Sequence, residues 1–246
     1  MTSKFGFGTG SLHHLPRKQA RVSLLRLANE IGITHFDTAP LYGYGLAEAS
    51  IGEAFQGRRQ EVTIATKIGL YPRLGMASSS SGMWIRKSIE KFLPSCRIPK
   101  FDWSRQQSEK SLKQSLNRLR TDYVDVLFVH EPHDRITNLP DLLEWLERKV
   151  TQGDIREFGV AGPPQSVKPY IGHKLGNVIQ TRNSFSNGEA SFLGQNGREL
   201  QFTYGYHRGE ASPCWRKLVR LPLSGVIVFS SRRKQRILAL ESAIRC

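Results

Sequence analysis

The stretch "SLKQSLNRLRTDYVDVLFVH", residues 111–130, passes from a helical pattern into a strongly apolar run. We expect a helix over about 104–119 and a strand over Val124–His130, which reads "VDVLFVH". An unpaired polar side chain at the end of such an apolar run would be costly. The histidine that ends this strand, His130, is therefore a candidate for a specific role.

Short strand patterns alternate with longer helical patterns along most of the chain, which is the signature of βαβ units and a parallel sheet. Helices are expected over 17–31, 47–55, 104–119, 139–152, 165–175, 214–219 and from about Lys234. Strands are expected over 4–8, 34–37, 62–67, 124–130, 157–161, 177–181, 200–204 and 225–230. Eight strands that alternate with helices predict an α/β fold, the (β/α)8 TIM barrel.

The main alternative is a doubly wound sheet, which more often has five to seven strands and, for a dinucleotide, a GxGxxG motif after the first strand. The sequence "GFGTGS" at this place has its glycines at the wrong offsets. Hydrophobic residues make up 39% of the chain and charged residues 23%, as in a globular protein. We therefore expect one barrel domain over 1–246.

Two segments depart from the alternation. Residues at about 70–103 contain "ASSSSG" and several prolines, so we expect a long loop excursion with a helical turn near 84–92. The segment 181–224 is short and rich in glycine and serine for the helix, strand and second helix that a barrel needs there. This leaves open a barrel that is incomplete around its sixth and seventh units.

Targeting and metal-binding signals are not evident in the sequence. The first thirty residues lack the apolar run of a secretory signal, and no stretch of 18 apolar residues occurs, so we expect a cytoplasmic protein that does not enter a membrane. The three cysteines, Cys96, Cys214 and Cys246, lack the spacing of zinc ligands and are expected to be plain thiols, with no bound metal.

The net charge of +15 raises the question of nucleic-acid binding. The basic residues are dispersed, however, with short clusters only at 118–120 and 232–236, and no nucleic-acid recognition motif accompanies them. Specific binding of nucleic acid is therefore not expected. A basic surface would also attract small anionic ligands such as nucleotide phosphates toward a cleft.

Four titratable residues follow adjacent predicted strands. Asp37 ends the second strand, Tyr42 lies in the loop after it, Lys67 ends the third strand and His130 ends the fourth. Chemistry in a barrel takes place at the carboxyl ends of its strands. Each residue alone has a structural explanation, such as a turn cap or a packed aromatic. Together they predict one active site at the mouth of the barrel.

The pKa values of these residue types indicate the chemistry. A lysine cation beside the tyrosine would lower the phenol's pKa from about 10, and an aspartate would hold the lysine charged and oriented. The histidine could bind a substrate oxygen. Such a set can protonate a carbonyl oxygen, while a hydride cofactor attacks the carbon. The residues thus favour reduction or oxidation of a small carbonyl compound.

The chain resembles the aldo-keto reductases, a family of NAD(P)-dependent (β/α)8 barrel oxidoreductases. The resemblance rests on "FDTAPLYG", "VTIATKIG", the stretch 111–130, "GDIREFGVAG" and "GVIVFSSRRKQRI". It implies that Asp37, Tyr42, Lys67 and His130 are a catalytic tetrad with Tyr42 as general acid or base. The segment "PLYGYGLAE" looks most like the branch of galactose, fucose and related aldose dehydrogenases, which implies a small carbonyl or sugar substrate.

The same resemblance implies a cofactor site. Ser230, Ser231 and Arg236, in "SSRRKQRI", fall where the family holds the adenosine phosphate. A guanidinium suits a 2′-phosphate, so NADP(H) is favoured over NAD(H), which stays the alternative. Gln180 ends its strand where the family often holds the nicotinamide amide.

Some residues depart from the family pattern. Ala161 and Gly162 stand where many members have serine and asparagine that contact the nicotinamide. Together with the depleted segment 181–224, this motivates an alternative function. The protein could be a catalytically impaired aldo-keto reductase-like protein that binds a cofactor or a protein partner in a regulatory role.

Overall fold

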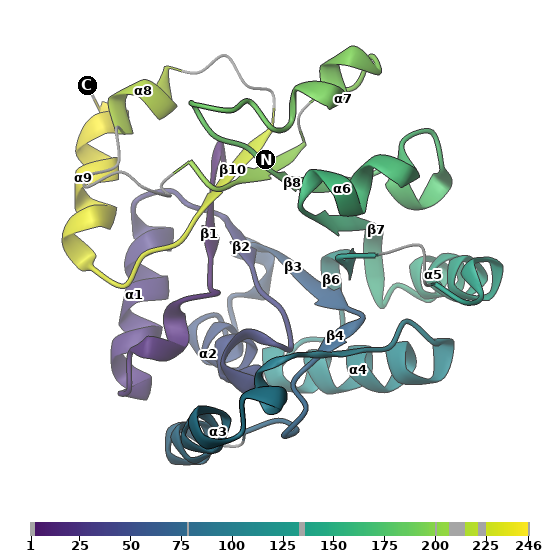
Figure 1. The fold of residues 1–246 in the computed structure, drawn as a ribbon. Helices are drawn as coiled ribbons and strands as arrows, with labels where there is room; N and C mark the ends of the chain where they lie inside the picture. Colours follow the sequence, from purple (N-terminus) through teal and green to yellow (C-terminus); the bar gives the residue numbers. More distant parts are fainter. Residues whose placement is uncertain are drawn as a thin grey trace.

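Eight parallel strands form a closed barrel in the computed structural model, which describes residues 3–77, 79–132, 136–199, 201–206, 215–220 and 225–245. The order around the barrel is β1-β10-β9-β8-β7-β6-β3-β2. Helices surround the strands (Figure 1). The predicted TIM barrel is confirmed. Its strands are β1 (Phe5–Gly8), β2 (His35–Asp37), β3 (Thr63–Ile68), β6 (Val124–His130), β7 (Ile155–Gly162), β8 (Ile179–Arg182), β9 (Phe202–Tyr204) and β10 (Val226–Phe229).

Alternate residues of each strand face the barrel interior. Ala65, Phe128 and Phe202 belong to a small apolar cluster inside it, whereas the larger apolar core lies between the strands and the helices. Two positions inside the barrel tolerate only glycine. A Cβ at Gly6 would lie 2.8 Å from the His35 ring, and a Cβ at Gly159 would lie 2.0 Å from the Val178 carbonyl oxygen. The strands can therefore approach each other closely enough to close the barrel.

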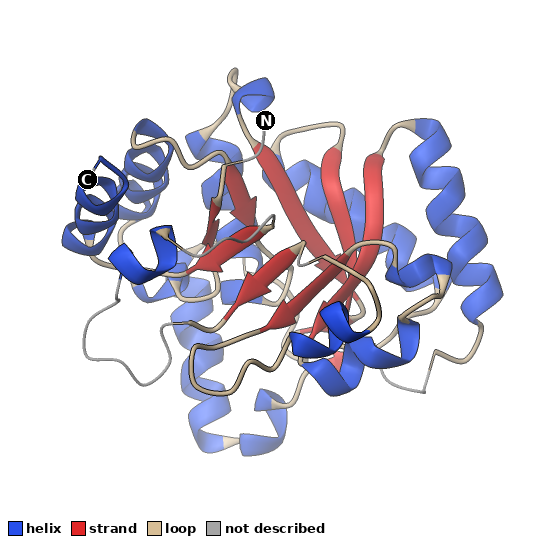
Figure 2. Ribbon diagram, turned by 90° about the horizontal axis from the view of Figure 1, so that it is seen from above, coloured by secondary structure: helices blue, strands red, loops and turns tan. Residues whose placement is uncertain are grey.

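Long helices cover the strands that carry the predicted tetrad, as Figure 2 shows for the blue helices around the red strands. The ends of these helices follow from local signals. Ser104 and Asn138 accept hydrogen bonds from backbone N–H groups in the first turns of α4 and α5, and α5 ends at Gly153 with a φ of 84°. The long helices are α1 (Lys18–Glu30), α2 (Leu46–Ala54), α4 (Arg105–Leu119), α5 (Leu139–Gln152) and α9 (Lys234–Arg245).

The segment between β3 and α4 contains more regular structure than the loop and helical turn expected there. It holds β4 (Leu70–Tyr71) and β5 (Lys100–Phe101), which pair antiparallel, and a 13-residue helix α3 (Ser80–Phe92). The serine run that indicated a loop supplies the start of this helix, because the Ser79 side chain accepts a hydrogen bond from the Gly82 N–H at 3.1 Å.

The prediction of a helix over 165–175 is correct only for the first turn. The structure has a four-residue helix α6 (Pro164–Val167), followed by 3-10 turns at Lys168–Tyr170 and Lys174–Gly176. Pro169 lacks the N–H that a continuing helix needs, and Gly172 has a φ of 81°, outside the helical region. Proline at this position ended the helix that the apolar spacing suggested.

The sixth and seventh units close the barrel, so their strands are not missing. β8 pairs with β9 and β9 with β10, both in parallel. The described helices of these units are short, with five residues each in α7 (Ser191–Gln195) and α8 (Trp215–Val219). Leu200 and Cys214, where a strand and a helix were expected to begin, lie outside the described residues. So does Cys246, whereas Cys96 is a free thiol.

No helix within the described ranges is both long enough and apolar enough to cross a membrane. Within the same ranges, no group of three or more histidine, cysteine, aspartate or glutamate residues is placed to hold a metal ion.

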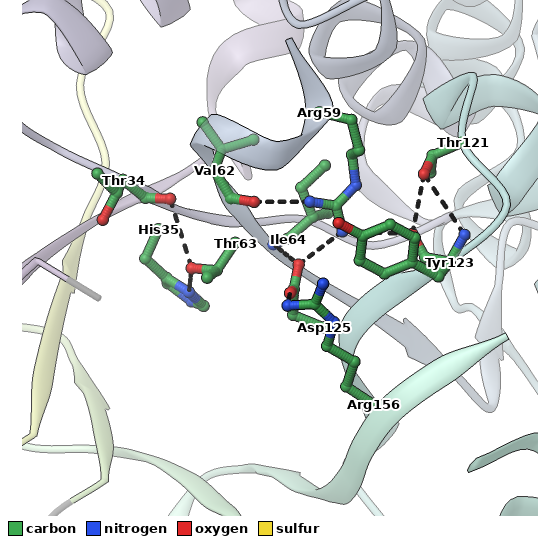
Figure 3. Close-up of polar contacts among 10 residues, drawn as sticks. All are labelled: Thr34, His35, Arg59, Val62, Thr63, Ile64, Thr121, Tyr123, Asp125 and Arg156. Atoms are coloured by element: carbon green, nitrogen blue, oxygen red, sulfur yellow. Dashed lines mark hydrogen bonds and ion pairs between the residues drawn. The ribbon is translucent and has the colours of Figure 1, made fainter. Parts of the chain in front are cut away.

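An ion cluster fastens the amino-terminal end of the barrel, opposite the mouth (Figure 3). Asp125, near the start of β6, binds Arg59 at 2.6 Å and Arg156 at 2.9 Å, and accepts a hydrogen bond from the Ile64 N–H at 2.8 Å. Both guanidinium groups lie over the ring of Tyr123, at 4.1 and 4.5 Å from its centroid. One carboxylate thereby joins β3, β6 and β7.

We expect Asp125→Ala to lower the free energy of unfolding by about 3 kcal/mol, because it leaves the half-buried Arg59 cation and the Ile64 N–H without their acceptor. Urea unfolding followed by circular dichroism measures the change. The matched control is Arg148→Ala, which removes an exposed pair with Glu144 and should cost about 0.5 kcal/mol or less. Equal effects of the two substitutions would contradict a fastening role for Asp125.

Candidate active site

A cavity of about 630 Å³ opens at the carboxyl ends of the barrel strands, and each of the eight strands contributes to its wall. This is the face on which the sequence placed the candidate residues, and the cavity contains all four of the predicted tetrad. Its strand-end lining consists of Gly8, Asp37, Lys67, His130, Ala161, Gly162, Gln180, Tyr204, Val228 and Phe229.

Asp37 and Lys67 form a buried ion pair in the wall of the cavity. The Lys67 Nζ lies 2.6 Å from the Asp37 Oδ1 and donates a second hydrogen bond to the Thr38 carbonyl at 2.9 Å. Both side chains are almost fully shielded from solvent. Burial lowers the pKa of Lys67, and the Asp37 carboxylate opposes this effect. The pair is close enough to keep the lysine charged without water.

Tyr42 lies at the start of a tight turn directly after β2. The turn continues through Gly43, Tyr44 and Gly45, which have φ values of 59°, 59° and 92°. The Lys67 Nζ lies 5.3 Å from the centroid of the Tyr42 ring, and His130 meets that ring edge-on at 6.2 Å. The structure thus brings Asp37, Tyr42, Lys67 and His130 together, as the sequence predicted.

The expected lowering of the Tyr42 pKa is not found. Burial, and after it the Asp37 carboxylate, raise the pKa of Tyr42 well above its usual value. Lys67 donates its hydrogen bonds to Asp37 and the Thr38 carbonyl. The Asp37 carboxylate therefore offsets most of the electrostatic effect of the lysine on the phenol. Tyr42 is a neutral phenol at physiological pH and therefore holds a proton to donate.

His130 is a neutral imidazole at the end of β6. Burial, and then the charge of Lys67, lower its pKa to about 3. Its Nδ1 is buried, and no described residue forms a hydrogen bond to it. The Trp103 Nε1 donates a hydrogen bond to the His130 carbonyl at 3.4 Å, which fixes the backbone here. A neutral imidazole that lines the cavity can bind a substrate oxygen without adding charge.

Gln180 lies beside the ion pair. Its Nε2 donates a hydrogen bond to the Asp37 Oδ1 at 2.9 Å, across β8 and β2. The side chain that sequence reasoning placed at the nicotinamide amide is thus also a partner of Asp37. This contact fixes the orientation of the Gln180 carboxamide at the cavity wall.

The three predicted phosphate-binding residues divide into two groups. Ser230 and Arg236 line the cavity, and the Ser230 Oγ lies 2.6 Å from the Ser11 Oγ, which also lines it. Ser231 is buried and stabilises the turn before the last helix, since its Oγ accepts a hydrogen bond from the Arg233 N–H at 3.1 Å. Ser231 supports the start of α9 and does not line the cavity.

The lining of the cavity fits a ligand with a flat ring and an anionic group. Gly8 and Gly10 place no side chain in one wall of the cavity. A Cβ at Gly10 would lie 3.7 Å from the Tyr42 ring. The Ser230 hydroxyl and the Arg236 guanidinium provide donors near the start of α9. A nicotinamide dinucleotide has the required flat ring and phosphates, so the residues present fit this cofactor.

Two residues of the cavity escaped the sequence analysis. Tyr204 ends β9 and Glu131 follows β6, and the Glu131 carboxylate is a further cause of the raised pKa of Tyr42. Glu131 has a φ of 44°, rare for a residue with a side chain, and its N–H donates to the Ala161 carbonyl at 2.6 Å. Both lie at strand ends, so the positional rule that selected the tetrad could have found them.

Residues 4–175 match the sequence profile of the aldo/keto reductase family. The chain therefore belongs to the aldo/keto reductase family. It is 30% identical over 185 residues to the uncharacterized oxidoreductase YqkF of Bacillus subtilis, over 75% of this chain and 52% of that protein. It is 29% identical to L-galactose dehydrogenase of Arabidopsis thaliana, over 69% of this chain and 47% of that protein.

Another relative is D-threo-aldose 1-dehydrogenase of a Pseudomonas species, 29% identical over 63% of this chain and 48% of that protein. The chain thus spans about half the length of the curated relatives that it matches.

Solved structures share the fold. The holo form of the aldo-keto reductase AKR11C1 from Bacillus halodurans superimposes with a TM-score of 0.73 at 21% identity, over 100% of this chain and 87% of that chain. An aldo/keto reductase from Klebsiella pneumoniae in complex with NADP and acetate gives 0.65 at 18% identity, over 100% and 87%. At these identities the likeness establishes the barrel and its topology.

We expect stability to decrease as the pH falls below about 6.5. Burial holds the pKa of His35, whose Nδ1 lies 3.0 Å from the Thr63 Oγ1, at about 4, and that of His130 at about 3. The unfolded chain binds these protons near pH 6.5, whereas the folded chain resists them until about pH 4 to 3. The free energy of unfolding therefore falls between pH 6.5 and 4.

Urea unfolding at several pH values measures this slope, and His35→Gln should make it shallower. As a direct check, the ring-proton NMR resonances of His35 and His130 should stay constant between pH 5.5 and 8. Titration of either ring near pH 6.5 would show that the site binds that proton and would contradict a neutral imidazole.

Proposed function

We propose that the protein is an NADP(H)-dependent oxidoreductase that transfers a hydride between the nicotinamide and a small carbonyl or sugar substrate. Tyr42 acts as its general acid or base. The observation that supports this most directly is the convergence of a neutral phenol, a buried ion pair and a neutral imidazole on one cavity at the barrel mouth.

Each residue has a defined part in this proposal. Tyr42 gives its phenolic proton to the substrate oxygen in reduction and takes one back in oxidation. The His130 imidazole binds the same oxygen and orients it. The Lys67 ammonium, held by Asp37, stabilises the negative charge that develops on Tyr42 when its proton leaves. A nicotinamide bound in the cavity would supply or accept the hydride.

The raised pKa of Tyr42 gives the two directions different pH dependences. The protonated phenol that reduction needs is present throughout the neutral range, so reduction should vary little between pH 6 and 9. Oxidation needs the phenolate, which becomes more accessible only as the pH rises. The two rates measured on the same protein thus report the protonation of Tyr42.

The cavity favours NADP(H) over NAD(H). Arg236 and Ser230 line it, and a guanidinium with a hydroxyl beside it suits a 2′-phosphate dianion. The related structure from Klebsiella pneumoniae is a complex with NADP. Ala161 and Gly162 offer no side-chain hydrogen bond to the nicotinamide, so we assign contact with its carboxamide to Gln180.

The substrate class is a sugar aldehyde, a lactol or a similar small carbonyl compound. Two of the relatives are named as dehydrogenases of sugars, L-galactose dehydrogenase and D-threo-aldose 1-dehydrogenase. The cavity lining includes the polar Glu131 and Tyr204 beside apolar residues such as Leu41 and Leu70, and the polar groups suit a hydroxylated substrate.

We expect Tyr42→Phe to lower kcat for reduction of a carbonyl panel by about 10²–10⁴-fold, because it removes the donated proton and keeps the ring. NADPH binding, measured by fluorescence quenching, should persist in this variant. Full turnover by Tyr42→Phe would refute the proposed role of this tyrosine.

The alternative, a catalytically impaired protein with a regulatory role, has a distinct signature in the same assays. It would show saturable NADPH binding in the parent protein without turnover on any carbonyl or sugar. That result would support a regulatory role that depends on a protein partner.

Arg236→Ala should weaken NADPH binding by about tenfold to hundredfold, since it removes a charge-assisted hydrogen bond to the 2′-phosphate. NADH binding should change little, because NADH lacks that phosphate. The control is Arg233→Ala, a neighbouring exposed arginine whose side chain does not line the cavity. An equal loss for both nucleotides would contradict a 2′-phosphate contact.

A further inference from the structure

A second, smaller cavity lies directly beside the first. It encloses about 130 Å³, and Leu41 lines both cavities. Gly43, which follows Tyr42 in the chain, also lines the smaller one. The rest of its wall comes from Tyr44 in the same turn, from His13 in the loop after β1 and from the segment that holds α3. Leu41 therefore lies between the two cavities.

Lys87, on α3, contributes a positive charge to the wall of the small cavity. Its Nζ donates a hydrogen bond to the His13 Nε2 at 2.9 Å. Burial, and then the charge of Lys87, lower the pKa of His13 to about 4, so this ring is neutral at physiological pH. Within the described part of the chain, no carboxylate lies within ion-pair distance of Lys87.

Arg97 adds a second cation to the same wall. Its Nε donates to the Glu90 carbonyl at 2.9 Å, and it too forms no ion pair with a described residue. Glu90 is the acidic residue of the described lining, and it lies beside the Tyr44 hydroxyl, where burial and this carboxylate raise the pKa of Tyr44. The described wall of this cavity thus contains two cations and one carboxylate. The cavity therefore carries a positive potential.

We propose that this cavity is a subsite for an anionic group, a carboxylate, on the part of the substrate that lies away from the reacting carbonyl. This inference rests on the proposed function and narrows its substrate class to carboxylated aldehydes and sugar acids. A half-buried ammonium beside a neutral ring is stabilised by an incoming anion. The cavity is large enough for a carboxylate and a few carbons, but it is too small for a nucleotide.

The steady-state test compares matched substrate pairs, succinic semialdehyde with butanal and D-glucuronate with D-glucose. The parent protein should prefer the carboxylated member in kcat/KM. In Lys87→Gln, the ratio of kcat/KM for the carboxylated to the neutral member should fall by about tenfold or more, mainly through KM. The control is Lys91→Gln, an exposed lysine on the same helix outside the cavity lining.

A binding measurement separates this inference from the proposed function. Succinate titrated into the NADPH-free protein by calorimetry should bind to the parent and Lys91→Gln proteins, and at least tenfold more weakly to Lys87→Gln. Succinate binding without turnover on any substrate would contradict the proposed oxidoreductase function and still support the subsite. Equal succinate affinities in all three proteins, or an unchanged kcat/KM ratio in Lys87→Gln, would overturn the subsite.

Discussion

The ion pair between Asp37 and Lys67 sets the electrostatics of the whole site. It is buried at the carboxyl ends of β2 and β3, with 2.6 Å between the charged atoms, and Gln180 attaches β8 to the same carboxylate. The Lys67 charge helps to keep His130 neutral, and the Asp37 charge helps to keep Tyr42 protonated. Burial is the larger cause in both cases, and the two charges of the pair act in the same direction as burial. A buried pair of this kind is weak evidence for stability in itself, which favours a chemical reason for its presence.

The barrel could be predicted because its strands are strongly apolar and are separated by regular helical patterns. The two regions that sequence reasoning misjudged each contain a local signal with two interpretations. The serines before α3 are typical of a loop, but Ser79 caps a helix. The apolar spacing after Pro164 predicts a long helix, but Pro169 ends it. In both cases a single residue decided between structures that the wider pattern allowed.

The site was predictable in position but not in its electrostatics. The rule that chemistry lies at strand ends selects Asp37, Tyr42, Lys67 and His130, and it extends to Tyr204. The direction of the pKa change at Tyr42 depends on the burial of the phenol and on its closeness to Asp37, and both follow only from the folded structure. The hydrogen bond between Gln180 and Asp37 likewise joins residues from distant strands, so no local sequence pattern could reveal it.

The strands of the barrel differ in the length of the helices that pack against them. Asp37, Lys67 and His130 come from strands backed by α1, α2, α4 and α5, which have 9 to 15 residues. Gln180 and Tyr204 come from strands whose described helices, α7 and α8, have five residues each. Fewer packed contacts allow local opening at lower free energy. We therefore expect the strands that carry Gln180 and Tyr204 to open locally at a lower free energy than the strands that carry Asp37, Lys67 and His130.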